Sequence, residues 1–465
     1  MEWIALVDST RRPIYSAIAD AVELAINRGL LHPGDRLPPH RVLARQLNID
    51  FTTVTRAYAE ARRRGLLDAT VGRGTFVRAT AQASAAPEES AYLDMGMNLP
   101  PQPREPSLRA LLRDGLSALL QTGDPAYLMS YRAGAGSPRE REAGAAWLEP
   151  VLGRVDPERI LLCAGAQAAF TALLTLLAKP GAAILTDPLV YPNFRALAAH
   201  LGIPLLPIES DEYGMIPEAV DLACRNCKPQ AIYCTPAIQN PTTLTMPGER
   251  RHALATVAAR HNVPVIEDDA YGLLPGNPQP AVATFAPQHV YYVSTLSKCL
   301  SPGFRLAYIA VPSLAEAQRL TAALRATSLM SAPLLASLMT RWITDATAVL
   351  LRDAVRRENM ARQKLASSIL PLGSFDAHAE GPHLWLSLPA SWHRLDFVAY
   401  ARQRGLALVP SDAFLAAPPT SDSTPPNAVR VCLGAAPNQE VLRAALESIA
   451  ETMRLTASPY LNDVV

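Results

Sequence analysis

The sequence predicts an α/β fold. We expect a large domain built on a doubly wound, mostly parallel sheet with a smaller C-terminal α/β subdomain, preceded by a small helical domain that ends in a hairpin. The first observation is a set of short apolar runs, each followed by a longer amphipathic stretch, since strands that alternate with helices form parallel sheets. These runs cover residues 160–163, 183–186, 231–234, 263–267, 290–293 and 306–311. The second observation is the segment 79–91, whose small and polar residues are typical of a linker.

These changes of composition also predict the domain boundaries. A chain of 465 residues is too long for one ordinary core, so at least two domains are expected. We assign a small N-terminal domain to residues 1–79, a linker to 80–93 and the large domain to 94–465. After about Leu324 a long helical stretch leads into a second alternating region, with strand-like runs at 384–388 and 429–433. The smaller subdomain is therefore expected over about 325–465.

The first domain is expected to consist of short helices followed by a hairpin. Pro13 suits the first turn of a helix, and the apolar residues after it recur at the helical period until Gly29. A short helix is expected at residues 41–47, and Asp50 is well placed to cap the next helix, over residues 51–64. Two short strand-like stretches then flank a glycine-rich turn at 71–74.

Two helices joined by a short turn and followed by a hairpin form the outline of a winged helix-turn-helix. In such a module the second helix enters the major groove with its N-terminal polar side chains, while arginines contact phosphates. The residues expected to contact an operator in double-stranded DNA are Arg41, Thr52, Thr53, Thr55, Arg56 and, at the hairpin tip, Arg73. Residues 1–80 hold twelve arginines and eight carboxylates, a net charge of +4 that agrees with this partner. Arg62, Arg63 and Arg64 are instead expected to form a solvated helix end.

Lysine is scarce in the chain, and one lysine has the surroundings of a cofactor site. A protein that holds pyridoxal 5'-phosphate as a Schiff base needs a lysine, a carboxylate at the ring nitrogen, a phosphate cradle and groups on the phenolic oxygen. The four lysines are Lys179, Lys228, Lys298 and Lys364. Of these, only Lys298 has phosphate ligands around it: the hydroxyls of Thr295 and Ser297 and the guanidinium of Arg305. We therefore predict that Lys298 carries the cofactor.

The remaining cofactor groups lie at the ends of the predicted strands. Three acids in a row, 267–269, end one strand, and the spacing favours Asp268 for the ring nitrogen, with Tyr271 reaching the phenolic oxygen. Asn240 is a second donor to that oxygen, and Tyr191 is expected to stack on the ring face. Ala166 and Gln167 open a helix whose free N–H groups suit a phosphate.

The two halves of the chain each resemble a known family. The stretch PGDRLPPHRVLARQLNIDFTTVTRAYAEARRRGLLDATVGRGTFV resembles the GntR superfamily of bacterial regulators, although Phe51 stands where that family often has an arginine and Pro39-His40 where it often has two serines. Residues from about 94 onward resemble a fold type I aminotransferase, with Thr295 and Ala166 where serine is common. This second resemblance implies the cofactor roles given above and adds Arg430, in AVRVCL, as the arginine that grips a carboxylate.

Together, the two halves resemble the MocR subfamily of transcriptional regulators. That resemblance implies a regulator whose large domain senses pyridoxal phosphate, an amine or an amino acid through the aldimine of Lys298, and a homodimer that often exchanges its N-terminal domains. Two alternatives stay open. The chain could be an active aminotransferase with an accessory DNA-binding domain, because Lys298, Asp268 and Arg430 are all present. Alternatively, pyridoxal phosphate alone is the effector, and the protein controls vitamin B6 metabolism.

Other classes of protein do not fit the composition. No apolar run reaches membrane-spanning length, and the N-terminus lacks the apolar core of a signal peptide, so we expect a cytoplasmic protein without a membrane partner. Six cysteines in a chain of this size do not predict a disulfide framework. Cys224-x-x-Cys227 has no fourth ligand nearby, so no metal site is expected.

Overall fold

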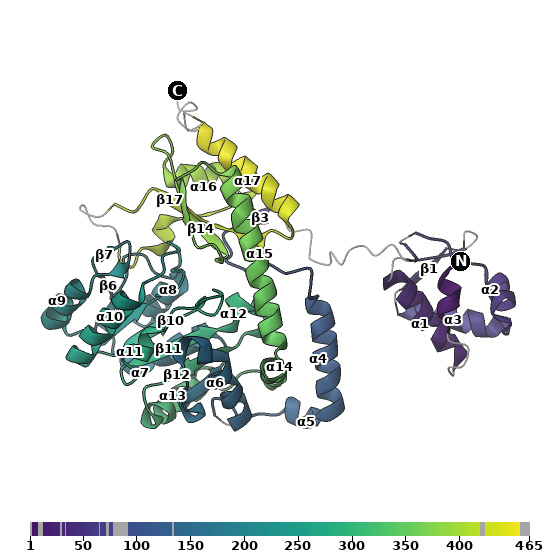
Figure 1. Cartoon of the computed structure of the whole chain (residues 1–465), viewed down its shortest axis with the longest axis horizontal. Helices are drawn as coiled ribbons and strands as arrows, with labels where there is room; N and C mark the ends of the chain where they lie inside the picture. The colour runs from purple at the N-terminus through teal and green to yellow at the C-terminus, as the bar shows by residue number, and fades with distance from the viewer. Residues whose placement is uncertain are drawn as a thin grey trace. The chain divides into compact units, whose positions relative to one another are not determined.

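The computed structural model describes residues 2–7, 13–27, 30–32, 34–64, 66–70, 74–77, 92–132, 134–418 and 424–455. The chain divides into two compact units, Met1–Ser90 and Ala91–Val465, which are described separately below (Figure 1). Residues 80–91 of the expected linker lie outside the described residues, as do Gly29 and the hairpin tip at 71–73 with Arg73.

The first unit is a winged helix-turn-helix, as predicted. Its elements are a 3-10 helix η1 (Glu2–Leu6), helices α1 (Ile14–Asn27), α2 (His40–Leu47) and α3 (Phe51–Arg63), and the antiparallel strands β1 (Leu67–Thr70) and β2 (Gly74–Val77). Asp50 caps α3, since its carboxylate accepts a hydrogen bond from the Thr52 amide at 2.7 Å. One core contributor was not predicted: Trp3 of η1 is buried among Ile18, Val54 and their neighbours.

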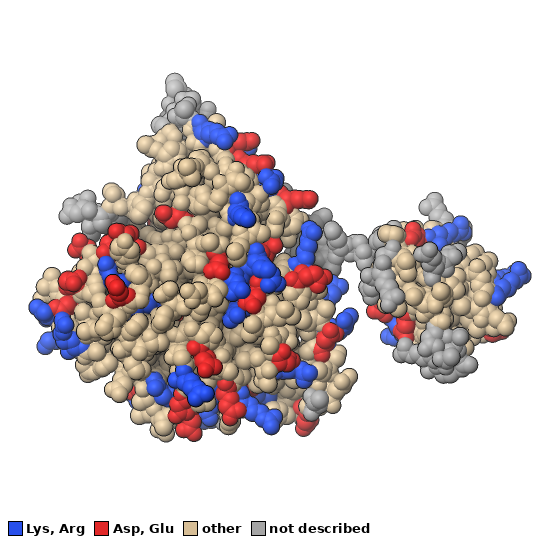
Figure 2. Space-filling view, in the orientation of Figure 1, with Lys and Arg blue, Asp and Glu red and all other residues tan. Residues whose placement is uncertain are grey.

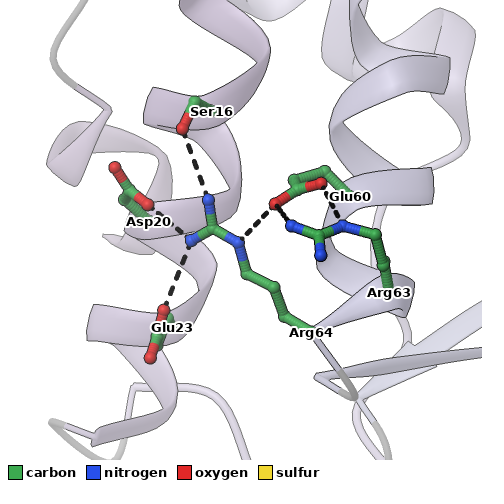
Figure 3. A network of polar contacts seen from close by, with 6 residues as sticks. All are labelled: Ser16, Asp20, Glu23, Glu60, Arg63 and Arg64. Carbon is green, nitrogen blue, oxygen red and sulfur yellow. Dashed lines mark hydrogen bonds and ion pairs between the residues drawn. The ribbon is translucent and has the colours of Figure 1, made fainter. Parts of the chain in front are cut away.

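The end of α3 differs from the sequence-based expectation, because Arg64 is not a solvated residue. Its guanidinium contacts Asp20 Oδ1 at 2.6 Å and Glu23 Oε2 at 3.4 Å on α1, and it donates to Glu60 Oε1 at 2.8 Å on α3 (Figure 3). It also donates to Ser16 Oγ at 3.3 Å. The apolar contacts between α1 and α3 bring these carboxylates close to Arg64, which therefore ties the two helices together. Arg63 is exposed, as predicted, and pairs with Glu60.

The second unit is built on a seven-stranded, mostly parallel sheet, which confirms the predicted fold class. The strand order is β4-β12-β11-β10-β9-β5-β6. The strands are β4 (Ile160–Cys163), β5 (Ile184–Thr186), β6 (Leu205–Pro207), β9 (Ala231–Cys234), β10 (Val265–Asp268), β11 (Val290–Thr295) and β12 (Ala307–Ala310). Only β12 runs antiparallel to its neighbours in this sheet. The connection 296–306 before it is too short for the crossover that a parallel pair requires.

Helices cover both faces of this sheet, which makes it doubly wound. One face packs against α6 (Pro138–Leu152), α9 (Pro217–Cys227), α10 (Gly248–His261) and α14 (Pro333–Thr344). The other packs against α7 (Ala166–Leu177), α8 (Pro192–His200) and α13 (Leu314–Ser328). Along β4, Ile160 and Leu162 belong to the first core and Leu161 and Cys163 to the second, the alternation of a strand buried on both faces.

A second, smaller sheet forms the C-terminal part of this unit. Its order is β13-β14-β17-β16, all antiparallel, with β13 (Phe375–Ala377), β14 (His383–Ser387), β16 (Val409–Pro410) and β17 (Ala428–Cys432). Helices α16 (Arg394–Gln403) and α17 (Gln439–Arg454) pack on it. The long helix α15 (Thr347–Ile369) runs from α14 to α17 and so joins the two parts (Figure 1). Strand β3 (Leu93–Asp94) pairs with β15 (Leu406–Ala407) and brings the start of the unit to this end.

The remaining elements are short or lie at the edge of the large sheet. They are α4 (Leu108–Thr122), α5 (Pro125–Leu128), α11 (Val282–Phe285), α12 (Leu296–Cys299), the hairpin β7 (Ser210–Asp211) and β8 (Gly214–Met215), and the 3-10 helices η2 (Pro157–Arg159), η3 (Pro302–Phe304), η4 (Ser411–Phe414) and η5 (Leu433–Ala435). Within the described residues, no single helix is long and apolar enough to cross a membrane, although α14 and α15, bent by 84°, meet that test of length and composition as a pair.

Candidate functional site

The predicted cofactor residues all follow the carboxyl ends of strands in the large sheet. Lys298 lies in α12 directly after β11, Asp268 ends β10, and Asn240 follows β9. Tyr191 follows β5 and caps α8, while Ala166 and Gln167 begin α7 after β4. Because these strand ends share one edge of the sheet, residues far apart in the sequence meet there, at the position where ligands bind in open α/β sheets.

Lys298 has an environment that favours a reactive amine. Its Nζ donates to the carbonyl oxygen of Asn98 at 2.6 Å. Burial lowers the pKa of Lys298 to about 8, and the nearby Arg430 and Arg305 guanidinium groups act in the same direction. At pH 7 about a tenth of such an amine is uncharged, far more than for an ordinary lysine. The uncharged amine is the form that attacks a carbonyl.

The three consecutive acids have different partners, and these agree with the assignment of Asp268. Glu267 accepts hydrogen bonds from the backbone amides of Val282 and Ala283 at 2.8 and 2.9 Å, so it caps α11. Asp269 accepts from the Tyr292 hydroxyl at 2.6 Å and from the Gly272 amide. Asp268 accepts from the Tyr233 hydroxyl at 2.6 Å, and burial raises its pKa to about 7. The outer two acids thus hold local structure, whereas Asp268, with one tyrosine as its partner, is the acid predicted for a ring nitrogen.

Side chains from both parts of the second unit meet around Arg430. Its Nη1 donates to Asn240 Oδ1 at 2.6 Å, and its Nη2 donates to the Gly96 carbonyl at 2.6 Å. Since the amide oxygen of Asn240 accepts, its amide nitrogen is left to donate, as the predicted role at a phenolic oxygen requires. The Arg430 guanidinium also lies 4.9 Å from the centre of the Phe414 ring.

The groups predicted to hold a phosphate lie close together. Gly165, the N-cap of α7, has φ of 87°. A Cβ atom at Gly165 would lie 3.7 Å from the guanidinium carbon of Arg305, so the free N–H end of α7 and Arg305 face the same place. Thr295 Oγ1 lies 3.1 Å from Ser297 Oγ. Two hydroxyls, a guanidinium and a helix N-terminus form a donor set that suits a phosphate dianion.

Electrostatic interactions link these residues into one cluster. The charges of Asp268, Arg430 and Arg305 all act on the phenol of Tyr191, whose pKa is raised first of all by burial. The same three charges act on Lys298, and those of Arg430 and Asp268 act on Tyr271, whose pKa burial raises strongly. Three polar atoms in the cluster, Asn98 Oδ1, His383 Nε2 and Arg430 Nε, are buried without a hydrogen-bond partner. Buried polar atoms without a partner, next to the hydroxyl, guanidinium and backbone donors described above, fit a polar ligand such as pyridoxal phosphate.

Three residues of the cluster were not predicted from the sequence. Asn98 Nδ2 donates to the Tyr271 hydroxyl at 2.8 Å and lies 3.2 Å from His383 Nδ1. Tyr233, the partner of Asp268, lies inside an apolar strand. Asn98 is 200 positions from Lys298, so no local pattern predicts their contact. Tyr233 offers one signal, because a tyrosine buried in a strand usually needs a partner for its hydroxyl.

The predicted DNA-contact residues that the structure describes lie on or near the N-terminal half of α3. Thr52, Thr55 and Arg56 are exposed, Thr53 is half-buried, and Arg41 is exposed on α2. The Arg56 guanidinium lies 4.7 Å from the centre of the Tyr15 ring of α1. On the visible face of the second unit, acidic and basic side chains are interspersed (Figure 2). Attraction to DNA therefore depends on the first unit rather than on that face.

Comparison with known proteins identifies both units. The family of bacterial regulatory proteins called GntR matches residues 14–77, and aminotransferase class I and II matches residues 92–449. YdeF, an HTH-type transcriptional regulator of Bacillus subtilis, is 33% identical over 450 residues, 96% of each chain. The vitamin B6 salvage pathway transcriptional repressor PtsJ of Salmonella typhimurium is 29% identical over 381 residues, 80% of this chain and 84% of that one.

Solved structures support the fold of the second unit. A kynurenine aminotransferase of Pyrococcus horikoshii, solved in complex with PMP, matches with a TM-score of 0.70 and 22% identity over 79% of this chain and 92% of that chain. A GntR-type winged helix-turn-helix followed by an aminotransferase-like domain defines a class of transcriptional regulators. The chain belongs to that class, the MocR subfamily of GntR-type regulators, and is a DNA-binding regulator whose second domain belongs to a pyridoxal phosphate-dependent fold family.

Proposed function

We propose that the aminotransferase-like domain binds pyridoxal phosphate at Lys298 and senses an amine, an amino acid or the cofactor itself, and that this event changes the affinity of the N-terminal domain for its operator. The observation that carries the proposal is the single cluster formed by Lys298, Asp268, Arg305 and Arg430. The name of the relative PtsJ supports vitamin B6 compounds as one class of effector. We expect the protein to act in the cytoplasm, where its DNA partner is.

Each residue of the cluster has a role in this proposal. Bound pyridoxal phosphate supplies an aldehyde carbon that exchanges amines and a ring that withdraws electrons. Lys298 offers an amine that is uncharged more often than that of an ordinary lysine, because burial lowers its pKa to about 8. Burial raises the pKa of Asp268 to about 7, and a protonated ring nitrogen beside it would keep this carboxyl ionised. The other roles are Tyr271 and Asn240 at the phenolic oxygen, Tyr191 on the ring face, and Ala166, Gln167, Thr295, Ser297 and Arg305 at the phosphate.

Arg430 is proposed to bind the carboxylate of an amino acid effector. Its two terminal nitrogens donate to Asn240 and Gly96, and the buried Nε has no partner. A carboxylate at this guanidinium competes with the oxygen of Asn240, so an effector there changes the contact between β17 and the loop after β9. An effector shifts DNA affinity only by as much as its own affinity differs between two states of the protein. The contact between Arg430 and Asn240 is a candidate for the structural difference between these states.

A homodimer is the proposed functional form. Four large apolar side chains between residues 120 and 131 are exposed: Leu120, Tyr127, Met129 and Tyr131, the last two by 78% and 84%. Exposed apolar patches of this kind mark protein interfaces. A twofold dimer also presents two copies of α3 to a pseudo-palindromic operator.

The decisive experiment compares Lys298→Ala with Lys364→Ala, a matched control because Lys364 is exposed on α15. Each protein is mixed with pyridoxal phosphate, freed of excess and assayed by visible absorbance. Its affinity is then measured for a duplex that the wild type enriches from a randomised library. We expect Lys298→Ala to bind this duplex but to lose both the absorbance and every effect of the cofactor and of added amino acids on affinity.

The same experiment separates the alternatives. Retention of the absorbance by Lys298→Ala would overturn the assignment of Lys298. Sustained conversion of an amino acid into its keto acid by the wild type would favour an active aminotransferase. A change in DNA affinity with pyridoxal phosphate alone, and none with amino acids, would identify the cofactor as the effector.

A further inference from the structure

Phe51, the first residue of α3, is exposed where the helix is expected to meet DNA. Its side chain is 45% exposed, the largest exposed apolar side chain among the described residues of the first unit. The unit has a well-formed core of its own, to which Val54, Ala57 and Tyr58 of the same helix contribute. Phe51 is therefore not needed to complete that core, and its ring faces outward.

The ring of Phe51 is held in place by its neighbours. The His40 ring lies 5.8 Å away, centre to centre, at an angle of 51°, and His40 in turn packs edge-on against Tyr58 at 4.7 Å. The Tyr58 hydroxyl donates to the Pro38 carbonyl at 2.8 Å, which fixes this stack to the chain before α2. One side of the Phe51 ring is thus supported from α2, and such support lowers the entropy lost when the exposed side meets a ligand.

The other side chains on this face of α3 have fewer groups free to read bases. Phe51, Thr52, Thr55 and Arg56 are spaced so that they share one side of the helix. The Thr52 hydroxyl donates to Asp50 Oδ1, and the Thr55 hydroxyl donates to the Phe51 carbonyl at 3.0 Å. Both hydroxyl hydrogens are therefore used inside the helix, and each threonine offers DNA an acceptor and a small methyl group but no hydrogen-bond donor. Of this set, Arg56 keeps its donors available, and Phe51 has the largest apolar surface available for contact with a base.

In the major groove, the apolar feature that distinguishes one base pair from another is the 5-methyl group of thymine. We propose that Phe51 reads the operator by packing its exposed ring edge on the methyl group of a thymine, so that this position specifies thymine through an apolar contact. The inference rests on the DNA-binding function of the first unit. It adds a sequence-reading residue that the hydrogen-bonding side chains of α3 do not supply.

The test uses the full-length protein with pyridoxal phosphate and the duplex that the wild type enriches from a randomised library. Each thymine of that duplex is replaced in turn by deoxyuridine, which lacks only the methyl group. We expect one thymine in each half-site at which the replacement weakens binding about fourfold, the factor that corresponds to burial of one methyl-sized group. In Phe51→Ala, thymine and deoxyuridine at that position should bind equally well.

Two variants serve as controls. Leu24→Ala removes an apolar side chain of similar exposure from α1, and it should keep the full effect of deoxyuridine. Phe51→Leu keeps an apolar side chain and should retain part of the effect, even if Phe51→Ala folds less well. The inference is overturned if no thymine responds in the wild type, or if Phe51→Ala responds as the wild type does. If the wild type enriches no sequence, the DNA-binding function itself fails, and the inference with it.

Discussion

Asn98 joins two groups of residues in the candidate cofactor site. Its carbonyl oxygen accepts from Lys298, and its side-chain nitrogen contacts both the Tyr271 hydroxyl and His383 Nδ1. An amide nitrogen carries two hydrogens and accepts none, so His383 Nδ1 has to accept. The ring proton of His383 is therefore assigned to Nε2. His383 thus acts as a positioning residue, since it holds the amide that in turn holds Tyr271.

Replacement of His383 should weaken cofactor binding without removing the covalent attachment at Lys298. In His383→Leu, one buried N–H of Asn98 loses its acceptor, which costs about 1 kcal/mol, or roughly a fivefold loss of pyridoxal phosphate affinity. Equilibrium dialysis measures this loss. His383→Asn supplies another acceptor and should recover part of it, whereas His252→Leu, at an exposed site on α10, should have no effect. Unchanged affinity in His383→Leu would contradict a positioning role.

The pH dependence of the contribution of His383 to pyridoxal phosphate affinity gives a second readout. Burial lowers the pKa of His383 to about 3, so the ring stays neutral over the range of about pH 5 to 8 in which histidines usually titrate. The difference in affinity between the wild type and His383→Leu should therefore be flat across that range. An inflection near the ordinary pKa of histidine would show that the ring is charged in part of the range.

At the scale of elements, the contact between α1 and α3 depends on a network that the sequence did not predict. Arg64→Ala removes the contacts with Asp20, Glu23 and Glu60 together, whereas Arg63→Ala removes only the exposed pair with Glu60 (Figure 3). We expect Arg64→Ala to lower the midpoint of thermal unfolding of the first unit by several degrees, and Arg63→Ala to change it little. Equal effects of the two variants would contradict a role of Arg64 between the helices.

The pH dependence of this network follows from Glu60. Hydrogen bonds from Arg63 and Arg64 lower the pKa of Glu60 to about 2 in the folded protein. A carboxyl group whose pKa is lower in the folded than in the unfolded protein stabilises the fold at every pH above its unfolded pKa. This stabilisation is lost as the pH falls towards the folded pKa. The stability difference between the wild type and Glu60→Gln should therefore persist at neutral pH and diminish between about pH 4.5 and 2. A difference that stays constant as the pH falls through that interval would exclude Glu60 as the titrating group.

Strands and helices were largely predictable, because their signals are local. The runs at 160–163 and 231–234 match β4 and β9, and Asp50 caps α3. Strand β6 was not predicted, since it is short, and its partly exposed residues lie at the edge of the sheet. The antiparallel direction of β12 was not predicted either, although the short connection before it is a signal in the sequence.

The residues proposed for the cofactor could be selected from the sequence for the same reason, since most of them end or follow a strand and have a distinctive side chain. The residues that hold them could not. Asn98 follows β3, which pairs with β15, and His383 begins β14 of the smaller sheet, so the two residues meet only through the packing of the folded chain. The sequence therefore indicates candidate groups for the ligand but not the residues that contact and orient these groups, and it left open what Phe51 does on α3.

At the scale of the whole molecule, the two units have separate tasks, and a dimer would couple them. The first unit contains the residues proposed to read DNA, and the second contains those proposed to bind the cofactor and effector. One copy of α3 contacts only one half-site, so regulation through the spacing of two half-sites requires that two chains associate. Occupation of both half-sites by one dimer also raises the effective concentration at the second site.

The exposed apolar patch at residues 120–131 makes the dimer testable. In the double variant Met129→Glu and Tyr131→Glu, two charges replace two of the most exposed apolar side chains, and their burial at an interface would be unfavourable. We expect sedimentation to show at least about a tenfold rise in the dimer dissociation constant. Affinity for a duplex with two half-sites should fall in parallel, whereas affinity for a duplex with one half-site should not change. Leu372→Glu is the matched control, because Leu372 is fully exposed at a distant position before β13. A double variant that remains dimeric would place the interface on another surface, and a wild type that sediments as a monomer with bound cofactor would refute the dimer altogether.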